Sequence, residues 1–597
     1  MKKLLLIVGA LVVLGGATGG ILYLLFPVQM STIGGLTRNY LVTLSTPAGT
    51  TVTESNPEYK GPGTVAASAP AEAAPAAVAT AGDWPSYNRT VTSDRYSPLT
   101  EINTKNVGQL KVLCTYDVGG YEAFESGLIM VNGALIGTTQ FDIFSLDPST
   151  CALNWRTRED YPPALLPANR GAAYSDGMLI RGTQDGRVLA YDFKTGKRVW
   201  ETRIADPKHG ESVPSAPIAY DGVVYIGNAG GDFKGGKGRM YALDAKTGKI
   251  LWEFFLVPKG NGEQARGPEG KSPLDMATWK MAPGLPVSGG GTWTSYTLDP
   301  KSGRLYVPGG NPAPDFAIAA REGENLFTDS LIVLDAKTGN YIHHFKIVPK
   351  DWHDWDVSSA PHLIQTMGGK RVLLLAPKDG HLYGFDLADN RPLYRVPVTR
   401  IENVGETFTP GQSVRFCPGA AGGAEWNGPS YVPQTNLVLI GEVELCDIVK
   451  PKDVEKLRRV DVGQPWAGMA TWNPFWAFGD LEVSSWAGWV YAVDADTGVW
   501  KWRLKSNYPI IAAVTPTAGG VVFFGDIGGN FYALDSATGQ KLWGQDLGGA
   551  LAGGVITYTA GGSQKVAVAG GFSMLAWPTK PVHAKVVVLG LGNAAAK

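Results

Sequence analysis

Three polar side chains in glycine- and proline-rich segments carry oxygen atoms that could bind a hard metal ion. Asp232 lies in GNAGGDFKGGKG, Asn311 in GGNPAPD and Asp356 in HDWD. Carboxylate and carboxamide oxygens are the ligands that Ca²⁺ takes, about six to eight at a time, and a carboxylate can also accept a proton from a substrate. Each residue has a structural alternative: a hairpin loop for Asp232, an Asn-Pro turn for Asn311, and turn formation or capping for Asp356.

The elements that must position these residues belong to an internal repeat. Each copy has an apolar strand, an Asp, usually a Thr-Gly turn, and in most copies an aromatic residue eight positions after the Asp. The copies are LDPSTCALNW, YDFKTGKRVW, LDAKTGKILW, LDAKTGNYIH, FDLADNRPLY, VDADTGVWKW and LDSATGQKLW. Each copy predicts a hairpin, and its Trp is suited to packing between neighbouring sheets.

The spacing of the copies favours a propeller over a solenoid. Successive Asp residues of the repeat lie 41 to 108 residues apart, and the two longest spacings indicate degenerate units or insertions. A solenoid needs more uniform repeats and capping ends, whereas units of roughly 40 to 50 residues match four-stranded blades. We therefore predict an all-β fold, an eight-bladed β-propeller.

The composition excludes several other classes of protein. Among 597 residues there are 77 Gly, 40 Pro and 18 Trp, and only 18% are charged. Gly and Pro at this density exclude a long helical or coiled-coil protein, and 44% hydrophobic residues exclude disorder for most of the chain. With 53 basic and 54 acidic residues, the chain has no electrostatic footprint for nucleic acid.

The N-terminus predicts a membrane anchor. Lys2 and Lys3 precede an uncharged apolar run from Leu4 to Phe26, which is long enough to cross a bilayer. A cleaved signal peptide is the alternative. The segment that follows is rich in Ala, Pro, Thr, Ser and Gly, and we expect a flexible tether. The predicted divisions are a cytoplasmic tip (1–3), a transmembrane helix (4–26), a linker (27–82) and the propeller (83–597).

Cysteine usage fits an exported protein. The chain has four cysteines, which allow three pairings. Proximity in sequence favours Cys114–Cys151 and Cys417–Cys446, and free buried thiols are the alternative. The sequence contains no CxxCH, so we expect no covalent c-type haem on this chain.

Several longer motifs resemble one known family. They are RYSPLTEINTKNVGQL, GGGTWTSYTLDP, GGNPAPD, HDWD and WNGPSY. With the repeat, which looks like a tryptophan docking motif, they make residues 84–592 similar to the pyrroloquinoline-quinone (PQQ) dependent alcohol dehydrogenases, or quinoproteins. These are eight-bladed propellers, and the resemblance here is to the type without a haem domain.

The resemblance implies a metal site and a catalytic base. Asp356 matches the base that takes the substrate's hydroxyl proton, and Asp232, Asn311 and Asp356 would bind the metal. Members that use a lanthanide carry a further Asp two positions after the base, where this chain has Ser358, so we expect Ca²⁺. At Asp232 the family normally has Glu. The shorter side chain requires that the ion shift or that a water molecule bridge the gap.

The resemblance also implies contacts with PQQ. Arg170 matches an Arg that pairs with a PQQ carboxylate, and Lys378 matches a cation beside the reactive quinone oxygen. Trp293 would form an aromatic floor under the quinone, although its spacing from the GGGT threonine is one residue shorter than usual. Glu125 and Asn427 match further polar contacts. A surface or hairpin position is the alternative for each of these residues.

Two departures from the family concern the substrate and the electrons. The methanol- and ethanol-oxidising members carry two adjacent cysteines over the quinone, where this chain has Ala164 and Leu165. Ile511 stands where an aromatic residue is common in the substrate pocket, which argues against assuming a small primary alcohol as substrate.

The sequence therefore predicts a periplasmic dehydrogenase tethered to the inner membrane, or soluble if its leader is cleaved. It would oxidise an alcohol or related hydroxyl substrate with PQQ and Ca²⁺ and pass electrons to cytochrome c or a membrane quinone. A sugar or polyol dehydrogenase would differ only in substrate. The alternative from another class is a non-catalytic PQQ-like propeller scaffold at the cell envelope. Retention of Asp356, Asn311, Arg170 and Lys378 favours the enzyme, whereas Asp232 and the missing cysteine pair are what a scaffold would show.

Overall fold

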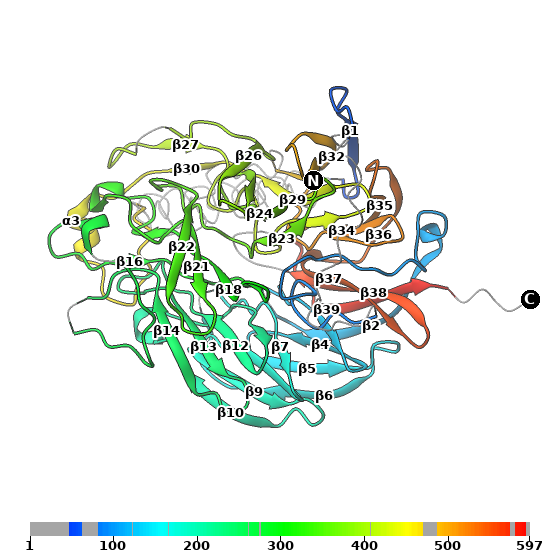
Figure 1. Ribbon diagram of the computed structural model, residues 1–597, viewed down its shortest axis with the longest axis horizontal. Helices are drawn as coiled ribbons and strands as arrows, with labels where there is room; N and C mark the ends of the chain where they lie inside the picture. The colour runs from blue at the N-terminus through cyan, green and yellow to red at the C-terminus, as the bar shows by residue number, and fades with distance from the viewer. Residues whose placement is uncertain are drawn as a thin grey trace, which may run out of the picture.

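The computed structural model describes residues 47–61, 82–121, 123–164, 166–260, 262–273, 276–405, 408–469, 486–572 and 579–592. Their strands form eight antiparallel sheets of four strands, one of which has a fifth strand added at its edge. The sheets are the blades of a propeller with almost no helix (Figure 1). The predicted eight-bladed all-β fold is confirmed.

The first four blades follow one another along the chain. Blade 1 contains β3 (Ile129–Val131), β4 (Ala134–Thr138), β5 (Asp142–Leu146) and β6 (Leu153–Arg158). Blade 2 contains β7 (Ala173–Ser175), β8 (Met178–Gly182), β9 (Arg187–Asp192) and β10 (Arg198–Arg203). Blade 3 contains β11 (Ile218–Tyr220), β12 (Val223–Gly227), β13 (Arg239–Asp244) and β14 (Ile250–Phe255). Blade 4 contains β17 (Thr297–Asp299), β18 (Arg304–Pro308), β21 (Ser330–Asp335) and β22 (Tyr341–Lys346).

The other four blades complete the ring. Blade 5 contains β23 (His362–Gln365), β24 (Arg371–Leu375), β25 (His381–Asp386) and β26 (Pro392–Pro397). Blade 6 contains β28 (Ser430–Val432), β29 (Leu437–Glu444), β31 (Ala487–Asp494) and β32 (Trp500–Ser506). Blade 7 contains β33 (Thr515–Pro516), β34 (Val521–Gly525), β35 (Asn530–Asp535) and β36 (Lys541–Asp546). Blade 8 contains β37 (Ala550–Ala560), β38 (Ser563–Phe572), β39 (Ala584–Leu591) and β2 (Leu110–Gly119).

Blade 8 closes the ring with strands from opposite ends of the chain. Its outer strand β2 pairs antiparallel with β39 in a register that starts at Leu110 opposite Leu591. Eight blades therefore contain only seven copies of the repeat. Each copy forms the turn between the third and fourth strands of a blade, and in blade 8 no turn connects these two strands. Closure of this kind leaves no gap between the first and last blades.

The shorter elements lie in the connections. The two-stranded pairs are β15 (Lys280–Met281) with β20 (Arg321–Glu322), β16 (Ser288–Gly289) with β19 (Pro312–Ala313), and β27 (Val414–Phe416) with β30 (Asp447–Val449). The helical turns are η1 (Val107–Gln109), η2 (Pro207–His209), η3 (Met276–Thr278), η4 (Ile318–Ala320) and α3 (Val454–Arg458). Except for η1 and η2, these elements lie within the two long repeat spacings, which are thus insertions.

Residues 51–55 of the predicted linker form a strand. This strand, β1 (Thr51–Ser55), is the fifth strand of blade 6 and pairs along its whole length with β32. The sequence TVTES is rich in β-branched residues, which favour a strand, and the edge of β32 offers unpaired backbone groups. This part of the segment is therefore attached to the propeller.

The Asp of the repeat organises the turn between the third and fourth strands. In blade 4, Asp335 Oδ1 accepts hydrogen bonds from Thr338 N and Thr338 Oγ1, both within 2.8 Å. Gly339 follows with φ of +70°, a conformation that favours glycine. Asp192 and Thr195 in blade 2 make the same two bonds, which explains the spacing of the motif.

The aromatic residue of the repeat contacts the next blade. The Trp155 indole of blade 1 donates to Phe193 O, and the Trp200 indole of blade 2 donates to Ala245 O, each at 3.0 Å. The Trp252 indole makes the corresponding bond to Ala336 O, also at 3.0 Å.

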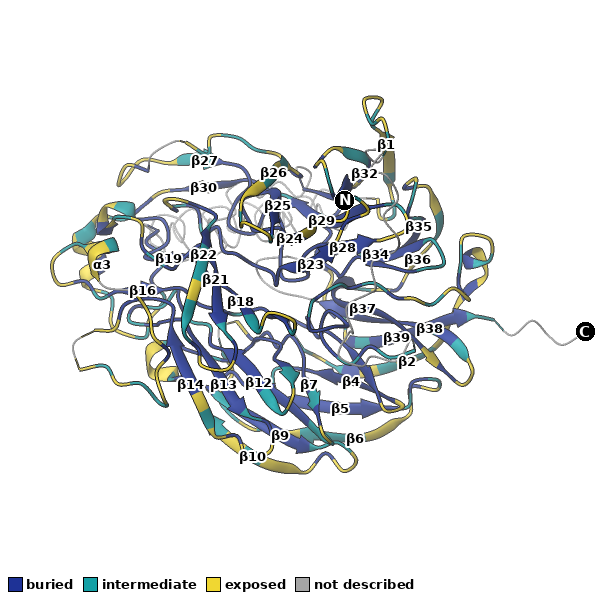
Figure 2. Ribbon diagram, in the orientation of Figure 1, coloured by how far each residue is buried: buried dark blue, intermediate teal, exposed yellow. Residues whose placement is uncertain are grey.

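Apolar side chains fill the spaces between adjacent blades. Ile143 of blade 1 packs with Leu189 of blade 2, and Phe144 of blade 1 packs with Val586 of blade 8 across the ring closure. Figure 2 shows buried inner strands and partly exposed outer strands such as β6 and β10. The hydrophobic core is thus a series of inter-blade layers around the ring.

Two disulfides are present, and both match the pairing favoured by sequence proximity. They are Cys114–Cys151 and Cys417–Cys446. No helix among the described residues is long and apolar enough to span a membrane. The predicted anchor at 4–26 lies outside the described residues.

Candidate active site

The predicted site residues all come from connections at one end of the propeller. In an antiparallel blade, the connection between the second and third strands lies at the same end as the connection to the next blade. Second-to-third connections supply Asp232, Asn311 and Lys378, and inter-blade connections supply Glu125, Arg170, Trp293, Asp356 and Asn427. The Asp-Thr-Gly turns between the third and fourth strands lie at the opposite end of each blade from the connections that carry the site residues.

Asp356 lies at the centre of a group of polar contacts. Its Oδ1 accepts a hydrogen bond of 2.9 Å from Asn311 N, and its Oδ2 lies 2.6 Å from Lys378 Nζ. The side chain of Asn311 in turn hydrogen-bonds Asp232. The structure therefore brings together the three residues that the sequence analysis assigns to a metal.

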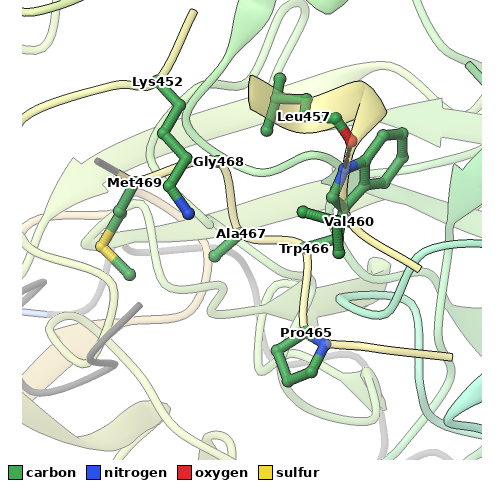
Figure 3. A pocket seen from close by; sticks show the side chains of 8 residues that line it. All are labelled: Lys452, Leu457, Val460, Pro465, Trp466, Ala467, Gly468 and Met469. Atoms are coloured by element: carbon green, nitrogen blue, oxygen red, sulfur yellow. Dashed lines mark hydrogen bonds between the residues drawn. The ribbon is translucent and has the colours of Figure 1, made fainter. Parts of the chain in front are cut away.

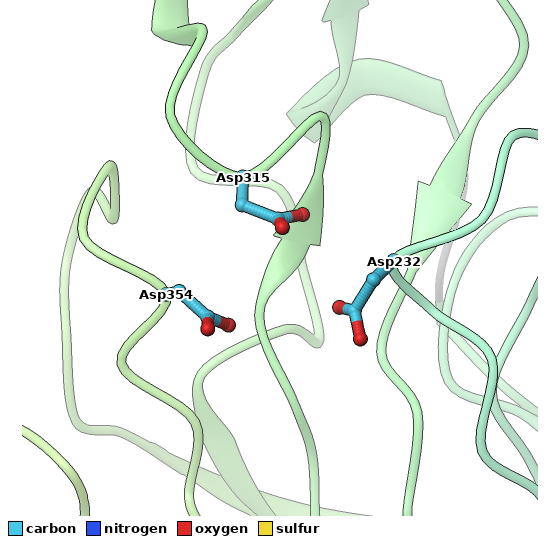
Figure 4. Close-up of side chains that lie close together, drawn as sticks. All are labelled: Asp232, Asp315 and Asp354. Atoms are coloured by element: carbon cyan, nitrogen blue, oxygen red, sulfur yellow. The ribbon is translucent and has the colours of Figure 1, made fainter. Parts of the chain in front are cut away.

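Two further carboxylates join this group. Asp315 follows β19, Asp354 precedes Asp356 in the connection to blade 5, and ligand oxygens of Asp232, Asp315 and Asp354 all lie within 4.8 Å of one another. Figure 4 shows the three carboxylates arranged around a common space. Asp315 and Asp354 were not among the residues predicted from the sequence, although they lie inside the motifs GGNPAPD and HDWD.

Burial, and in addition the proximity of these carboxyl groups to one another, raises their pKa values. Burial raises the pKa of Asp232 to about 6, with a further contribution from Asp356, while Lys378 and a hydrogen bond with Asn311 oppose the rise. Burial and then Asp232 raise the pKa of Asp315 well above its usual range. Burial likewise raises the pKa of Asp354, against the charge of Lys378. Carboxyl groups that repel each other in this way suit a cation among them, so the residues present fit a hard metal ion.

Lys378 is held in its charged form. Burial alone would lower its pKa, but Asp354 and Asp356 raise the pKa well above the usual value for lysine. Its Nζ lies 5.5 Å from the centroid of the Trp293 ring. A fixed positive charge therefore stands beside both Asp356 and an aromatic surface.

Arg170 provides a second cation on the same aromatic ring. Its guanidinium carbon lies 4.5 Å from the centroid of Trp293 and 5.0 Å from that of Trp426. Its Nη2 lies 2.7 Å from Glu125 Oε2. Burial raises the pKa of Glu125 to about 7, and the charge of Arg170 opposes that rise. Arg170 therefore contacts both Glu125 and Trp293, and all three residues are predicted from the sequence to bind PQQ.

Hydroxyl groups beside Trp293 have no hydrogen-bond partner among the described residues. They are the side-chain oxygens of Thr294 and Ser295, and both side chains are buried. Buried polar atoms are normally hydrogen-bonded. Unpaired donors beside an aromatic ring with two cations therefore fit a planar cofactor that carries acceptor oxygens, such as PQQ.

Asn427 is bonded to protein atoms on both sides of its amide. Its Oδ1 accepts a hydrogen bond of 3.0 Å from the Tyr87 hydroxyl, and its Nδ2 donates one of 2.7 Å to Ile511 O. The Trp426 indole donates to Ala552 O at 2.9 Å. Asn427 therefore holds the WNGPSY segment in place, and its contact with the cofactor stays a prediction.

Glu425 is a buried acid that the sequence analysis missed. Burial raises its pKa to about 7, Lys378 opposes the rise and Asp356 adds to it. Glu425 directly precedes the motif WNGPSY, which contains Asn427. Nothing in the sequence indicates that Glu425 lies near Lys378.

The positions at which the sequence departs from the family have different surroundings in the structure. Ile511 is buried in the same apolar cluster as Trp426, with Trp293 packed against it. Ser358 Oγ donates a hydrogen bond of 2.7 Å to Ala424 O. Ala164 is half-buried, and Leu165 lies outside the described residues.

Part of the long connection between β30 and β31 of blade 6 lies against the loop that carries Asp232. Trp466 N donates a hydrogen bond of 2.7 Å to Asp232 O, and Lys234 Nζ donates one of 2.6 Å to Val460 O. A small pocket, lined mainly by apolar side chains between Lys452 and Met469, lies in this segment (Figure 3). The carboxylates of the site are not part of its lining.

Comparison with protein families gives two matches. Residues 84–416 match the family described as glucose/ethanol/alcohol dehydrogenase, beta-propeller domain. Residues 487–576 match the family of the outer membrane protein assembly factor BamB. All the predicted site residues lie before residue 487, so the second match covers blades without any of them.

Characterised relatives are similar over most of their length. The dehydrogenase subunit of a quinone alcohol dehydrogenase from Gluconobacter oxydans (strain 621H) is 31% identical over 82% of this chain and 70% of its own. The quinohemoprotein alcohol dehydrogenase ADH-IIG from Pseudomonas putida is 32% identical over 82% of this chain and 72% of its own. A solved structure of ADHIIG from Pseudomonas putida HK5 superposes with a TM-score of 0.75 and 27% identity, covering 86% of this chain and 81% of that one.

Proposed function

Because this chain belongs to the PQQ-dependent alcohol dehydrogenase family, we propose that it oxidises an alcohol or related hydroxyl substrate with PQQ and Ca²⁺. It is an enzyme of the quinoprotein oxidoreductase class. The observation that carries the proposal is the convergence of Asp356, Asn311 and Lys378 beside Trp293 and Arg170.

The chain's own residues suggest how the substrate would be handled. Asp356 would accept the substrate's hydroxyl proton, because its carboxylate is fixed by Asn311 N and Lys378. Lys378, which stays charged, would stabilise negative charge that develops next to it. Asp232, Asn311 and Asp356 would hold the metal, and Arg170, Glu125 and Trp293 would hold the cofactor. When bound, PQQ supplies a quinone that takes up the two electrons from the alcohol carbon.

The export and electron-transfer parts of the proposal rest on the sequence and on the disulfides. Disulfides form and persist in oxidising compartments, and this chain has two. We therefore propose a periplasmic protein, anchored by residues 4–26, that passes electrons to cytochrome c or a membrane quinone. We also propose that the repeated indole bonds between blades act as the docking contacts of the ring.

An Asp356→Asn variant tests the catalytic assignment. Asparagine keeps the shape of the side chain but cannot accept the proton, so we expect turnover in a dye-linked alcohol assay to fall by at least about 10³-fold, with PQQ binding retained. Asp244→Asn, at the opposite end of blade 3, is the matched control and should keep wild-type activity. Wild-type turnover by the Asp356 variant would contradict the role of the base.

Reconstitution separates the enzyme from the scaffold. The purified chain is loaded with PQQ and CaCl₂, and a panel of primary, secondary and polyol substrates is added. We expect the absorbance of the bound quinone to change with at least one alcohol, and the responding member would identify the substrate class. A chain that binds neither PQQ nor Ca²⁺ would support the scaffold.

A further inference from the structure

We propose that Asp315 and Asp354 are direct ligands of the ion bound at Asp232, an inference that rests on the proposed function. The three carboxylates come from three separate connections: the loop between β12 and β13, the segment after β19, and the connection before β23. Their ligand oxygens lie within 4.8 Å of one another (Figure 4). Two oxygens bound to one Ca²⁺ at about 2.3 to 2.6 Å are at most about 5 Å apart. The group is therefore close enough to share one ion.

Asp315 gives an independent indication that something binds in this space. Its side chain is only 3% exposed, and its Oδ1 has no hydrogen-bond partner in the part of the chain that the structure describes. The neighbouring Arg321 donates its hydrogen bond to the main-chain oxygen of Asp315, not to the carboxylate. A buried carboxylate oxygen without a partner is unfavourable, and a cation among the three carboxylates would satisfy it.

Lys378 alone does not compensate the negative charge of the three carboxylates and Asp356. Lys378 Nζ is already 2.6 Å from Asp356 Oδ2, and its distance to Asp354 Oδ2 is 3.7 Å. The two added ligands would also compensate for the shorter side chain at position 232, where the family normally has Glu. A side chain shorter by one methylene draws the ion toward its own loop, and Asp315 and Asp354 supply oxygens within 4.8 Å of the Asp232 carboxylate.

Ser358 takes no part in this arrangement. Its hydroxyl donates to Ala424 O, so the extra ligands come from positions four residues after Asn311 and two before Asp356. The structure thus assigns a five-residue ligand set to this chain: Asp232, Asn311, Asp315, Asp354 and Asp356.

Calcium titration of the chain tests the assignment. Metal-stripped full-length protein, saturated with PQQ, is titrated with CaCl₂ in a calorimeter. We expect Asp315→Asn and Asp354→Asn each to weaken Ca²⁺ binding at least tenfold relative to wild type. Two variants at different connections keep the test valid if one of them folds poorly, which circular dichroism would reveal.

Asp526→Asn is the matched control, because it changes a buried carboxyl of blade 7 that lies outside the group and accepts a hydrogen bond of 2.7 Å from the Tyr532 hydroxyl. We expect its Ca²⁺ affinity to stay within threefold of wild type. If Asp315→Asn and Asp354→Asn bind Ca²⁺ like the control while wild type binds Ca²⁺ and oxidises alcohols, the inference fails and the proposed function stands. If wild type binds no Ca²⁺, both fail.

Discussion

The ammonium group of Lys378 links the acid group to the aromatic surface of the site. It contacts Asp356 and Asp354 and lies beside the Trp293 ring. A cation fixed in this way costs no reorganisation when negative charge develops during a reaction. The strength of its effect depends on burial, because Lys378 is only 8% exposed and screening by water is weak there.

A Lys378→Met variant should therefore lose activity through the charge and not through packing. Methionine fills a similar apolar volume, so we expect the fold to be retained and kcat to fall by about 10²- to 10³-fold. Lys378→Arg keeps the charge and should recover part of kcat. Steady-state kinetics of the two variants with a dye acceptor provide the measurement. Equal losses in both would show that geometry, and not charge, is what Lys378 contributes.

Asp526 predicts a pH dependence of stability away from the active site. It is fully buried in blade 7, where it accepts hydrogen bonds from the Tyr532 hydroxyl and from Ser506 Oγ. Burial raises its pKa to about 6, against these hydrogen bonds. A carboxyl with a raised pKa in the folded state stabilises the fold below its unfolded pKa of about 4, and that contribution is lost as the pH rises through 6.

We expect Asp526→Asn to remove this contribution. The unfolding free energy of wild type minus that of the variant should fall by about 2 to 3 kcal/mol between pH 4 and pH 7. Denaturant titrations at pH 4, 5, 6 and 7 measure the difference. A difference that is constant over this range would mean that Asp526 is not protonated in the fold at low pH.

At the scale of elements, the repeat predicts the positions of the blades but not the structure of the connections between their strands. The Asp-Thr-Gly turn and the following aromatic residue are local, so seven blades could be recognised from the sequence. The fourth strand of blade 8, β2, carries no such turn because its partner strand lies at the other end of the chain. The long insertions before β17 and β31 have no repeat to mark what they contain.

The site residues that could be predicted from the sequence are those that lie in a recognisable local motif. Asp232, Asn311 and Asp356 stand out because each lies in a recognisable motif, whereas Asp315 and Asp354 share two of those motifs and were not selected. Their proximity is set by where connections of blades 3, 4 and 5 meet in space. Spacing along one connection carries no information about the position of another. Burial of Glu425 beside Lys378 is equally a product of the ring.

Two glycines of blade 4 separate the effect of backbone conformation from that of packing. Gly303 and Gly339 have φ of +66° and +70°, but a Cβ at Gly303 would meet nothing, whereas one at Gly339 would lie 2.6 Å from the Trp252 ring. We expect Gly303→Ala to cost about 1 kcal/mol and Gly339→Ala about 1 to 3 kcal/mol more. Denaturant unfolding of both variants measures this, and equal costs would mean that the contact with Trp252 adds nothing.

At the scale of the whole molecule, the site depends on a closed ring. Its residues come from eight connections, within blades and between them, that run from the link between blades 8 and 1 to the link between blades 5 and 6. Each connection is held by the packing of neighbouring blades. A ring that opened between blades 8 and 1 would release Glu125, which lies in that connection, from Arg170 in the next. Closure is therefore a condition for the site as well as for stability.

The disulfide Cys114–Cys151 lies at this closure. Cys114 is in β2 of blade 8 and Cys151 is in the turn between β5 and β6 of blade 1. Cys417–Cys446 lies in the connections around blade 6, and its sequence separation of 29 is close to the 37 of the first bond. The two disulfides should therefore restrict the unfolded chain by similar amounts, about 3 to 4 kcal/mol each.

Replacing each pair by serine distinguishes ring closure from this general effect. Both double variants, Cys114→Ser with Cys151→Ser and Cys417→Ser with Cys446→Ser, should lose about 3 to 4 kcal/mol of unfolding free energy. Only the first should also speed hydrogen exchange selectively in β2 and β39, because only there does the bond hold the closing strand to blade 1. Exchange followed by mass spectrometry resolves these strands. Unchanged protection of β2 and β39 in the first variant would show that strand pairing and the Phe144–Val586 packing close the ring without the disulfide.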